Sequence, residues 1–476
     1  MPGDRAGEVV VIARPRLVLA GLSGGSGKTL VSLGLTRALA DQGLRVTPCK
    51  KGPDYIDAAW LTLAARRPAV NLDAFLFPET HILPLFLEKT AEADLAVIEG
   101  NRGLFDGLDA QGSYSTAALA RTLCAPVVLC LDVTKMTRTA AAVVAGVAHF
   151  EPGLALAGVI LNRTGGARHR ALVRECVESL AGVPVLGALP RLPQNPIPER
   201  HMGLFSDREY SGAADVCGGL AAVVRDNVDL DRVLAIARSA PPLAAPAVPP
   251  VESPAPEGDA PVIGVVRDAA LWFYYPENFE ALTRAGARLA FVSLLDAAPW
   301  PALDGLYLGG GFPETQAARL ADNTALRERV RALAVAGLPV YAECGGFMYL
   351  CEALVTGETT YPMAGVFPLT TTLCPRPQGL GYSLARVVAP NPFHPVGALL
   401  PGHEFHYSRC LGPNLPSPQQ FCLTMERGAG MIDGRDGLVS GNVFAAYTHI
   451  HAAGVPHWAG NFVAAARRYR AALGKG

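Results

Sequence analysis

The chain has 476 residues, of which half are hydrophobic and 17% are charged, and its formal net charge is −1. This composition excludes a mainly disordered protein, and the nearly balanced charge gives no general reason to bind nucleic acid or an anionic membrane. The ten cysteines include no C-x-x-C pair, which argues against a zinc ribbon or a disulfide framework. No uninterrupted apolar stretch is long enough to predict a transmembrane helix. We therefore expect a cytoplasmic globular protein of two or three domains.

The first chemical motif follows a short apolar segment, residues 16–20, that predicts a buried strand. The motif is GLSGGSGKT, residues 21–29, and a helical pattern follows it from Leu30 to Leu39. This order predicts a phosphate-binding P-loop, although position 22 is leucine where the usual spacing has glycine. Backbone amides would surround the phosphates, the lysine would reach the outer phosphates, and the hydroxyl would contact Mg²⁺. The residues expected to bind the nucleotide are Gly24, Gly25, Ser26, Gly27, Lys28 and Thr29.

Acidic residues follow the P-loop in two places. Asp54 and Asp57 lie three residues apart in the stretch KKGPDYID, and Glu99 comes directly after a strand predicted over residues 95–98. Open parallel sheets bind their ligands at the carboxyl ends of their strands. Because Mg²⁺ is usually held by few carboxylates and several waters, Asp54 and Glu99 are candidate Mg²⁺ ligands together with Thr29. A solvated helix cap is the alternative for the two aspartates.

Strand and helix patterns alternate through the rest of the N-terminal half. The predicted strands span 126–132, 156–161 and 183–189, and the predicted helices span 139–147 and 169–180. Asn162 follows one of these strands and could contact a nucleotide base or the substrate, with a loop cap as the alternative. Arg200 and His201, in the stretch PERHMGL, could bind an anionic substrate, with an exposed loop as the alternative.

A segment rich in proline and alanine, residues 241–260, predicts a linker between two domains, residues 1–240 and 261–476. A second α/β pattern then begins, with strands predicted over 262–266 and 288–292 and a helix over 277–285. The stretch LYLGGGFPE, which starts at Leu306, is a strand that leads into three glycines. The backbone of Gly310 or Gly311 could donate to an oxyanion, with a plain turn as the alternative.

Cys344 occupies the position of a nucleophile elbow. An apolar run over residues 338–342 predicts a buried strand, and Gly345 and Gly346 directly after the cysteine predict a sharp turn into a helix. Such a turn exposes the side chain at the sheet edge and leaves nearby backbone N–H groups, such as that of Gly345, to stabilise an oxyanion. A buried, inert cysteine is the alternative.

Histidines late in the chain supply candidate bases for this cysteine. His449 lies beyond a strand predicted over residues 443–446, and a cysteine paired with a histidine forms a thiolate at neutral pH. His403 and His406 form an H-x-x-H pair, but this pair falls short of the H-E-x-x-H pattern of zinc proteases. The sequence therefore favours His449 as a base over a metal site at His403 and His406.

With these motifs in hand, nearly the whole chain resembles the cobyrinic acid a,c-diamide synthases, which are glutamine-dependent amidotransferases of cobalamin biosynthesis. The resemblance rests on the stretches GLSGGSGKT, KKGPDYID, EGNRGLFDG, PERHMGL, FYYPENFE, LYLGGGFPE, AECGGFMYL, GHEFHYS and YTHIH. It implies an α/β fold with a dethiobiotin-synthetase-like P-loop domain of parallel strands, followed by a flavodoxin-like class I glutamine amidotransferase domain. The displaced first glycine of the P-loop is normal in dethiobiotin-synthetase-like proteins.

The resemblance also assigns roles to residues. Cys344 becomes the glutaminase nucleophile and His449 its base. The residues assigned to the synthase half are Lys28 and Thr29 at the nucleotide and the acids Asp54, Asp57 and Glu99. Many class I glutaminases have glutamate two places after the histidine, whereas this chain has His451, so a backbone carbonyl or another carboxylate could orient His449. The expected substrate site comprises Lys51, Asp54, Tyr55, Asp57, Asn162, Arg200 and His201.

The implied reaction uses ATP, Mg²⁺ and glutamine to amidate acetate carboxylates of cobyrinic or hydrogenobyrinic acid through an acyl phosphate. The stretches EGNRGL and DVTKMTR are also similar to a related branch that amidates sirohaem-type tetrapyrroles, which is the alternative substrate class. A deviant-Walker ATPase switch is a more distant alternative, because the chain carries glutaminase motifs and such a switch needs no glutaminase. A tetrapyrrole polycarboxylate, glutamine and ATP are therefore the expected partners, and a homodimer is compatible with the sequence.

Overall fold

The computed structural model describes residues 11–194, 196–197, 199–200, 203–204, 210, 212–244, 260–296, 298–411 and 415–474. Positions 199, 200, 203, 204 and 418 are described by their backbone alone. The chain divides into two compact units, Met1–Ala74 with Pro78–Pro249 and Phe75–Phe77 with Pro250–Gly476. The division after Pro249 lies within the segment predicted as a linker, and the assignment of Phe75–Phe77 to the second unit has no counterpart in the sequence analysis.

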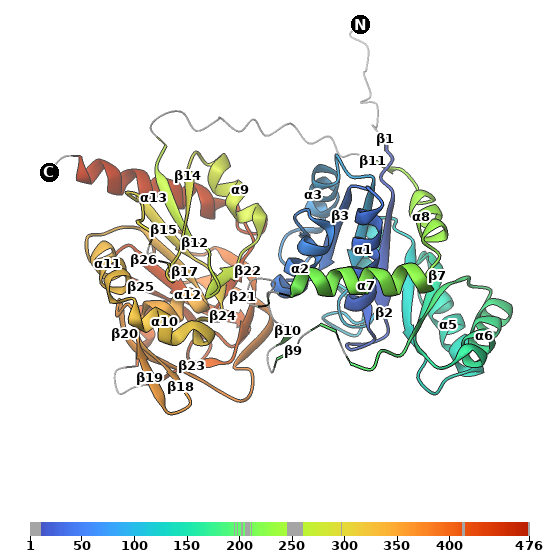
Figure 1. The fold of residues 1–476 in the computed structure, drawn as a ribbon. Helices are drawn as coiled ribbons and strands as arrows, with labels where there is room; N and C mark the ends of the chain where they lie inside the picture. Colours follow the sequence, from blue (N-terminus) through green and yellow to red (C-terminus); the bar gives the residue numbers. More distant parts are fainter. Residues whose placement is uncertain are drawn as a thin grey trace, which may run out of the picture. The chain divides into compact units, whose positions relative to one another are not determined.

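Parallel strands form the main sheet of the first unit, which is shown in blue to green in Figure 1. In the order in which they neighbour one another, the strands are β4 (Val70–Leu72), β3 (Val46–Lys51), β5 (Leu95–Glu99), β2 (Arg16–Gly21), β6 (Val127–Asp132), β7 (Leu156–Thr164) and β8 (Val185–Pro190). All six residues of β2 are buried, as expected for the central strand of a sheet that is covered on both faces. This sheet confirms the predicted parallel α/β architecture.

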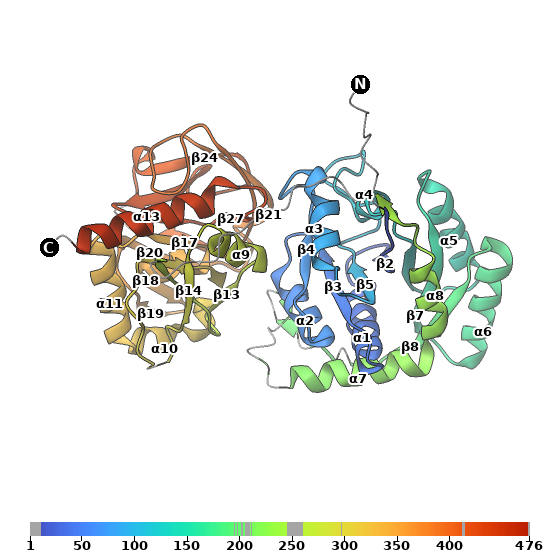
Figure 2. The ribbon, with the colours of Figure 1, turned by 90° about the horizontal axis from the view of Figure 1, so that it is seen from above.

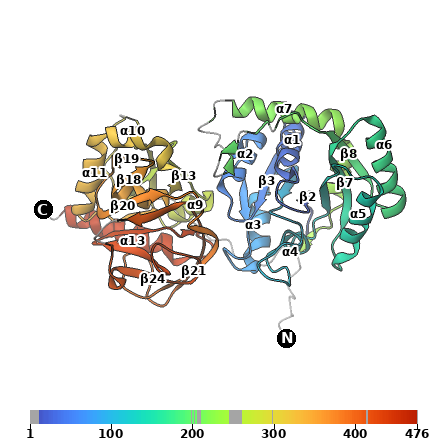
Figure 3. The ribbon, with the colours of Figure 1, turned by 90° about the horizontal axis from the view of Figure 1, so that it is seen from below.

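Helices cover both faces of this sheet. They are α1 (Lys28–Asp41), α2 (Tyr55–Ala65), α3 (Ile82–Lys89), α4 (Thr116–Thr122), α5 (Arg138–Phe150), α6 (Ala167–Cys176), α7 (Ala213–Asn227) and α8 (Leu230–Arg238). Figures 2 and 3 show α1, α2 and α7 on one face and α3 and α4 on the other. Helices α1 and α7 approach closely at Gly34, where a Cβ atom would lie 2.6 Å from Val224 Cγ2.

Short strands occur at the margins of the first unit. Strand β1 (Val11–Ile12) pairs with β11 (Leu243–Ala244), and β9 (Glu199–Arg200) pairs with β10 (Gly203–Leu204). Strand β11 lies within the segment predicted as a linker, so the first residues of that segment belong to the first unit.

The second unit contains a ten-stranded sheet, half parallel and half antiparallel. Its parallel half consists, in spatial order, of β14 (Arg288–Val292), β12 (Val262–Val266), β15 (Gly305–Leu308), β17 (Val340–Glu343) and β26 (Val443–Ala446). Numbered along the chain, these five strands have the order 2-1-3-4-5, which is the flavodoxin-like order. The flavodoxin-like architecture expected of this domain is therefore confirmed.

The second unit contains further strands that the sequence analysis did not identify, most of them between residues 351 and 442. The ten-stranded sheet continues with the antiparallel strands β25 (Arg435–Ser440), β24 (Phe421–Arg427), β21 (Gly379–Val387), β22 (Leu399–His406) and β27 (His449–Ile450). A second sheet contains β19 (Thr359–Pro362), β18 (Cys351–Thr356), β20 (Phe367–Leu373) and β23 (Ser408–Leu411). A two-stranded sheet pairs β13 (Leu271–Phe273) with β16 (Gly310–Gly311).

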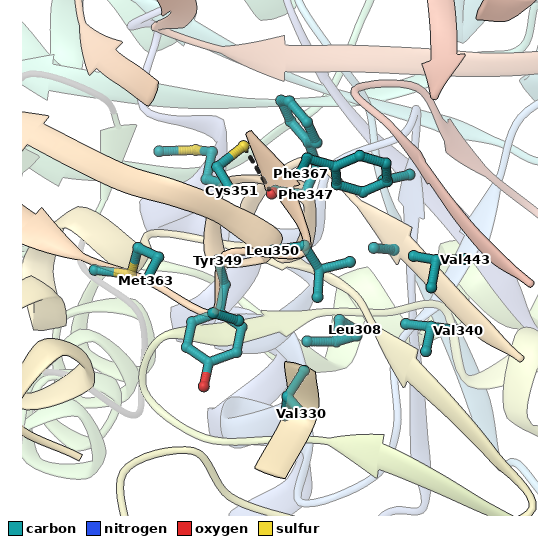
Figure 4. Packing of buried hydrophobic residues seen from close by; sticks show 14 of the residues in the cluster. Leu308, Val330, Val340, Phe347, Tyr349, Leu350, Cys351, Met363, Phe367 and Val443 are labelled. Carbon is teal, nitrogen blue, oxygen red and sulfur yellow. Dashed lines mark hydrogen bonds between the residues drawn. The ribbon is translucent and has the colours of Figure 1, made fainter. Parts of the chain in front are cut away.

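Alternation along the parallel strands of the second unit builds two separate cores. Val340 and Ala342 pack on one face, which is covered by α10 (Ala317–Asp322), α11 (Thr324–Val335) and α12 (Gly345–Leu350). Tyr341 packs on the opposite face beneath α9 (Pro276–Arg284) and α13 (His457–Leu473). Figure 4 shows the first of these cores, with Val340 and Val443 beside Leu308 and Leu350. Successive side chains of a strand point to opposite faces of the sheet, so consecutive residues pack into different cores.

Among the described residues, no helix combines the length and the apolar character needed to cross a membrane.

Candidate functional sites

A cavity of about 760 Å³ lies at the P-loop of the first unit. This volume lies in the range of sites that bind small molecules and cofactors. Its wall includes six residues that the sequence analysis singled out: Gly25, Gly27, Lys28, Thr29, Asp57 and Asn162. Gly24 and Ser26 lie in the same loop, where Gly24 is exposed and Ser26 is buried. The structure therefore gathers the predicted nucleotide residues around one cavity.

Gly27 caps the N-terminus of α1 in a conformation that favours glycine. Its φ is 90°, and a Cβ atom there would lie 2.1 Å from Nδ2 of Asn162. The same Nδ2 donates a hydrogen bond of 2.9 Å to the carbonyl of Ser26. Asn162 follows the P-loop by more than 130 residues, and it reaches the loop because β7 runs parallel to β6 and β6 runs parallel to β2. Its amide therefore supports the loop backbone directly.

Lys28 donates hydrogen bonds to two backbone carbonyls, those of Ser23 at 3.0 Å and Arg102 at 2.7 Å. Burial lowers the pKa of Lys28, and the nearby Glu99 carboxylate opposes this shift. These contacts hold the ammonium group within the loop that is expected to surround phosphates.

Lys50 forms the centre of an acidic cluster at the carboxyl ends of β3 and β5. Its side chain is 2% exposed, and Nζ lies 2.5 Å from Asp57 Oδ2, 2.9 Å from Glu99 Oε1 and 4.0 Å from Asp54 Oδ2. Burial opposes the charge on Lys50, but the carboxylates of Asp57, Glu99 and Asp54 together raise its pKa. The sequence analysis named the three acids and missed this lysine.

The two aspartates of the cluster have different roles. Asp54 is the N-cap of α2, and its Oδ1 accepts hydrogen bonds of 2.9 Å from the backbone amides of Ile56 and Asp57. Burial and the neighbouring Asp57 carboxylate raise the pKa of Asp54 to about 7. Burial also acts on Asp57, but the adjacent Lys50 ammonium lowers its pKa. Asp54 is thus a helix cap and a member of the cluster at once.

Glu99 and Thr29 bring the P-loop into contact with this cluster. The hydroxyl of Thr29 donates a hydrogen bond of 2.8 Å to Glu99 Oε1. The other oxygen, Oε2, is buried and has no hydrogen-bond partner among the described residues. Burial raises the pKa of the carboxyl group, which is 0% exposed. A hydroxyl and a buried carboxylate are the hard oxygen donors that Mg²⁺ prefers, so both residues fit such a cation.

Within the described part of the chain, no group of three or more histidine, cysteine, aspartate and glutamate side chains is arranged to hold a metal ion.

Other predicted substrate residues lie apart from the cluster or beyond the described side chains. Lys51 points away from Lys50, since its Nζ pairs with Asp73 Oδ2 at 3.5 Å, and it lines a separate cavity of about 490 Å³. Tyr55 is buried at the first position of α2. The backbone of Arg200 lies in β9, but its side chain is not described, and His201 lies outside the described residues.

In the second unit, Cys344 occupies the sharp turn between β17 and α12. Its φ of 45° and ψ of −101° are rarely adopted by residues with a side chain, and its amide donates a hydrogen bond of 2.7 Å to the Ala446 carbonyl. The cysteine is 3% exposed, its sulfur lies 3.7 Å from the Phe405 carbonyl oxygen, and burial raises the pKa of the thiol well above its usual value. Burial agrees with an inert cysteine, but the unusual backbone agrees with a nucleophile elbow.

His449 is fully buried and contacts the residue that precedes the cysteine. Its Nδ1 lies 3.4 Å from Oε2 of Glu343, the last residue of β17. The imidazole also stacks on the ring of His403, with 4.8 Å between ring centroids. Burial and the proximity of His449 lower the pKa of His403 well below its usual value. The parallel pairing of β17 with β26 therefore brings the predicted base next to the elbow.

The glycines predicted at the oxyanion lie between these two groups. A Cβ atom on Gly310 would lie 2.3 Å from Cε1 of His449, and a Cβ atom on Gly345 would lie 3.0 Å from the amide nitrogen of Gly311. Strand β16 therefore passes closely against both the elbow and the imidazole. This approach is possible only because Gly310 and Gly345 have no side chains.

His403 and His406 do not share a site. They are three residues apart on β22, so they point to opposite faces of the strand. The His403 Nδ1 lies 3.4 Å from the Tyr275 hydroxyl, whereas the His406 Nδ1 lies 2.9 Å from the Ser408 carbonyl oxygen. Burial lowers the pKa of His406 to about 4.

The sequence analysis missed two carboxylates beside the late histidines. Glu343 contacts His449, and Glu277 Oε2 lies 3.6 Å from Nε2 of His451. Glu343 carried a usable signal, because it ends the strand that leads into the elbow and thus lies where ligands bind to parallel sheets. Glu277 carried none, since its contact with His451 depends on the packing of α9.

Comparison with known proteins assigns both halves of the chain. Residues 17–204 match the CobQ/CobB/MinD/ParA nucleotide binding domain, and residues 262–456 match the CobB/CobQ-like glutamine amidotransferase domain.

Relatives match over nearly the full length. The cobyrinate a,c-diamide synthase of Magnetococcus marinus is 43% identical over 448 residues, which cover 94% of this chain and 96% of the relative. The protein of the same name from Archaeoglobus fulgidus is 42% identical, and the match covers 92% of this chain and 94% of the relative. The one from Salmonella typhimurium is 38% identical, and the match covers 95% of this chain and 98% of the relative. The chain therefore belongs to the cobyrinate a,c-diamide synthase family of glutamine-dependent, amide-forming ligases.

Proposed function

We propose that this protein amidates the a and c acetate carboxylates of cobyrinic acid, or of hydrogenobyrinic acid, with ammonia from glutamine and with ATP as the activating nucleotide. The observation that carries the proposal is the full-length match to relatives named cobyrinate a,c-diamide synthase. The nucleotide-binding match and the Cys344 elbow beside His449 support the division of the reaction into two halves.

The glutaminase half would use Cys344 and His449. The cysteine thiol transfers its proton to His449, and the resulting thiolate attacks the side-chain amide carbon of glutamine. Backbone amides near Gly310, Gly311 and Gly345 stabilise the oxyanion that forms. Ammonia leaves with the proton that His449 returns to it, and water hydrolyses the thioester to release glutamate. Because burial raises the pKa of Cys344, the thiolate forms only with a proton acceptor at hand.

The synthase half would use the P-loop cavity. A carboxylate is a poor acyl donor until its oxygen becomes a leaving group, so the substrate carboxylate attacks the γ-phosphorus of ATP, releases ADP and forms an acyl phosphate. Ammonia then displaces phosphate from this intermediate. Lys28 and the loop amides neutralise phosphate charge. The Lys50 cluster, whose member Asp57 lines the same cavity, orients the substrate carboxylate and the nucleotide phosphate that it attacks. Mg²⁺, when bound through Thr29 and Glu99, supplies further charge neutralisation at the phosphates.

Purified protein offered Mg-ATP and glutamine with cobyrinic acid, hydrogenobyrinic acid or sirohaem in parallel tests the proposal, with products weighed by mass spectrometry. We expect two successive amidations of one of the two corrinoids. Amidation of sirohaem alone would transfer the activity to the alternative substrate class, and no amidation of any of them would overturn the proposal. Glu99→Gln is expected to remove ATP-dependent amidation with both glutamine and free ammonia.

A further inference from the structure

We infer that Glu343 is the positioning carboxylate of His449, and that it takes the place of the glutamate that many class I glutaminases have two residues after the histidine. The inference rests on the proposed glutaminase role of Cys344 and His449. Glu343 immediately precedes Cys344, and the register of β17 with β26 pairs it with Ala446, three residues before His449. The nucleophile and the group that orients its base are therefore consecutive residues.

Both oxygens of the Glu343 carboxylate have partners in this buried site. Oε2 lies 3.4 Å from His449 Nδ1 and 3.3 Å from the hydroxyl of Tyr307, which donates to it. Oε1 accepts a hydrogen bond of 3.3 Å from the backbone amide of Ile450. These contacts fix the carboxylate against the imidazole, in a place where solvent does not compete.

Asn278 holds the backbone next to His449 in place. Its Nδ2 donates 3.0 Å to the Ile450 carbonyl, and its Oδ1 accepts 2.7 Å from the Ala452 amide. Its Nδ2 also lies 3.3 Å from the hydroxyl of Tyr307, which in turn contacts Glu343. One asparagine thus connects both sides of the contact between Glu343 and His449.

The contact has a defined chemical consequence. A carboxylate beside Nδ1 accepts a hydrogen bond from it, which places the proton of the neutral imidazole on Nδ1 and leaves Nε2 to accept the proton of the thiol. The same carboxylate stabilises the imidazolium that forms. Without it, the imidazole can carry its proton on Nε2, where it cannot act as a base towards the cysteine.

The other ionisable groups around His449 do not supply this function. His403 stacks on the imidazole and His406 lies nearby, and burial disfavours the charged form of both rings. Asp436, on β25, accepts from the backbone amides of Tyr447 and Thr448. Glu277 faces His451 at 3.6 Å. Glu343, in contrast, contacts the His449 ring directly, with 3.4 Å between Oε2 and Nδ1.

The test compares Glu343→Gln with Glu277→Gln as a matched control in the full-length protein. Hydrolysis of glutamine to glutamate is followed without any corrinoid. We expect Glu343→Gln to lower kcat by about a hundredfold or more with little change in KM, by analogy with the loss of a base-orienting carboxylate in other triads. We also expect the rising limb of its pH profile to move to lower pH, because the imidazolium loses its stabilising anion. Glu277→Gln is expected to stay close to wild type.

A second variant and a second readout separate positioning from folding. Glu343→Asp keeps the charge and should recover part of the lost kcat together with the wild-type pH profile. The rate at which iodoacetamide alkylates Cys344 at neutral pH should fall in Glu343→Gln, because the imidazolium that accompanies the thiolate loses its stabilising anion. Wild-type kcat and pH profile in Glu343→Gln, or the larger loss in Glu277→Gln, would overturn the inference.

The outcome is distinguishable from failure of the proposed substrate. Loss of glutaminase activity in Glu343→Gln supports the inference even if neither corrinoid is amidated by the wild type. Amidation with free ammonia by Glu343→Gln supports it further, because this reaction does not need His449.

Discussion

Lys50 Nζ lies 2.9 Å from Glu99 Oε1, and neither side chain is more than 2% exposed. The two residues are paired in register on the parallel strands β3 and β5. Lys50 lies one residue before the carboxyl end of β3, and Glu99 is the last residue of β5. Taking two charges out of water is costly, and their mutual attraction offsets that cost only when the geometry is good. The pair is therefore a point where stability and the expected ATP chemistry depend on the same atoms.

Replacing Lys50 by Met should destabilise the first unit by about 3–5 kcal/mol, because it leaves the buried carboxylate of Glu99 and the half-buried carboxylate of Asp57 without their cation. Hydrogen exchange of the amides in α2 and β3, measured by mass spectrometry, reports the free energy of opening in this region. The matched control is Arg45→Ala, which removes an exposed ion pair with Asp94 and should change exchange little. Equal effects of both substitutions would contradict the buried-cluster interpretation.

Asp54 should make the stability of the first unit depend on pH. Burial and Asp57 raise its pKa in the folded state to about 7 from an ordinary value of 3.8, so the folded protein binds the proton more tightly than the unfolded chain. The stabilisation from Asp54 is therefore complete below about pH 4 and is lost as pH rises through 7.

Asp54→Asn removes this titration and keeps a good N-cap for α2. Thermal midpoints measured from about pH 3 to pH 9 should show that the wild type loses stability relative to the variant between about pH 4 and pH 7, with a constant difference above about pH 8. Parallel curves across the whole range would show that the Asp54 pKa is close to its ordinary value.

Motifs identified most of the first site but could not choose between adjacent residues. Lys50 and Lys51 are consecutive in the sequence, yet they project to opposite sides of β3, one towards Glu99 and the other towards Asp73. An alternation of apolar and polar residues shows which face of a strand is buried, but only where the other face is exposed to solvent. Lys50 and Lys51 are both buried, so the alternation does not distinguish them. The cluster partner of a buried lysine is therefore set by strand pairing, which a motif does not contain.

The second site shows the same limit. Cys344 and His449 could be predicted because a strand–Gly-Gly turn and a strand–histidine pattern are local. The position of Glu343 at the end of a strand could be read from the sequence, but its contact with His449 depends on the pairing of β17 with β26, which are about a hundred residues apart. The strands between residues 351 and 442 were missed although neighbours along the chain pair in three cases, β18 with β19, β21 with β22 and β24 with β25. The sequence analysis identified strands from continuous apolar runs, and strands of this segment instead alternate imperfectly between buried and exposed residues.

Gly310→Ala should damage the glutaminase half selectively. The new Cβ would lie 2.3 Å from Cε1 of His449 and 3.1 Å from a ring atom of Phe273, so the imidazole must move. A displacement of about 1 Å in a catalytic group can lower the rate about a hundredfold. Glutamine-dependent turnover should fall by that order, while turnover with free ammonia should be retained.

Gly460→Ala is the control for this substitution. Gly460 lies in α13 of the same unit, and a Cβ atom there would meet no other atom within 4 Å. Because alanine favours the helix, this variant should be fully active and slightly more stable. Retained glutaminase activity in Gly310→Ala would show that His449 does not need the close approach of β16.

Cys344→Ala is the most direct test of the two-site arrangement. The substitution keeps the Cβ atom and the turn but removes the sulfur, so no thioester can form, and glutamine-dependent amidation should fall by several orders of magnitude. Amidation with free ammonia should persist, because the P-loop cavity is formed by residues of the first unit alone.

The control is Cys351→Ala, which removes a second buried cysteine of the same core, one whose sulfur contacts the Phe347 carbonyl (Figure 4). If both cysteine variants keep glutamine-dependent activity, then Cys344 is an inert core residue and the nucleophile lies elsewhere. If both lose activity with both nitrogen donors, the loss reflects damage to the core rather than to the chemistry, because alanine at either position leaves a cavity in the same hydrophobic cluster.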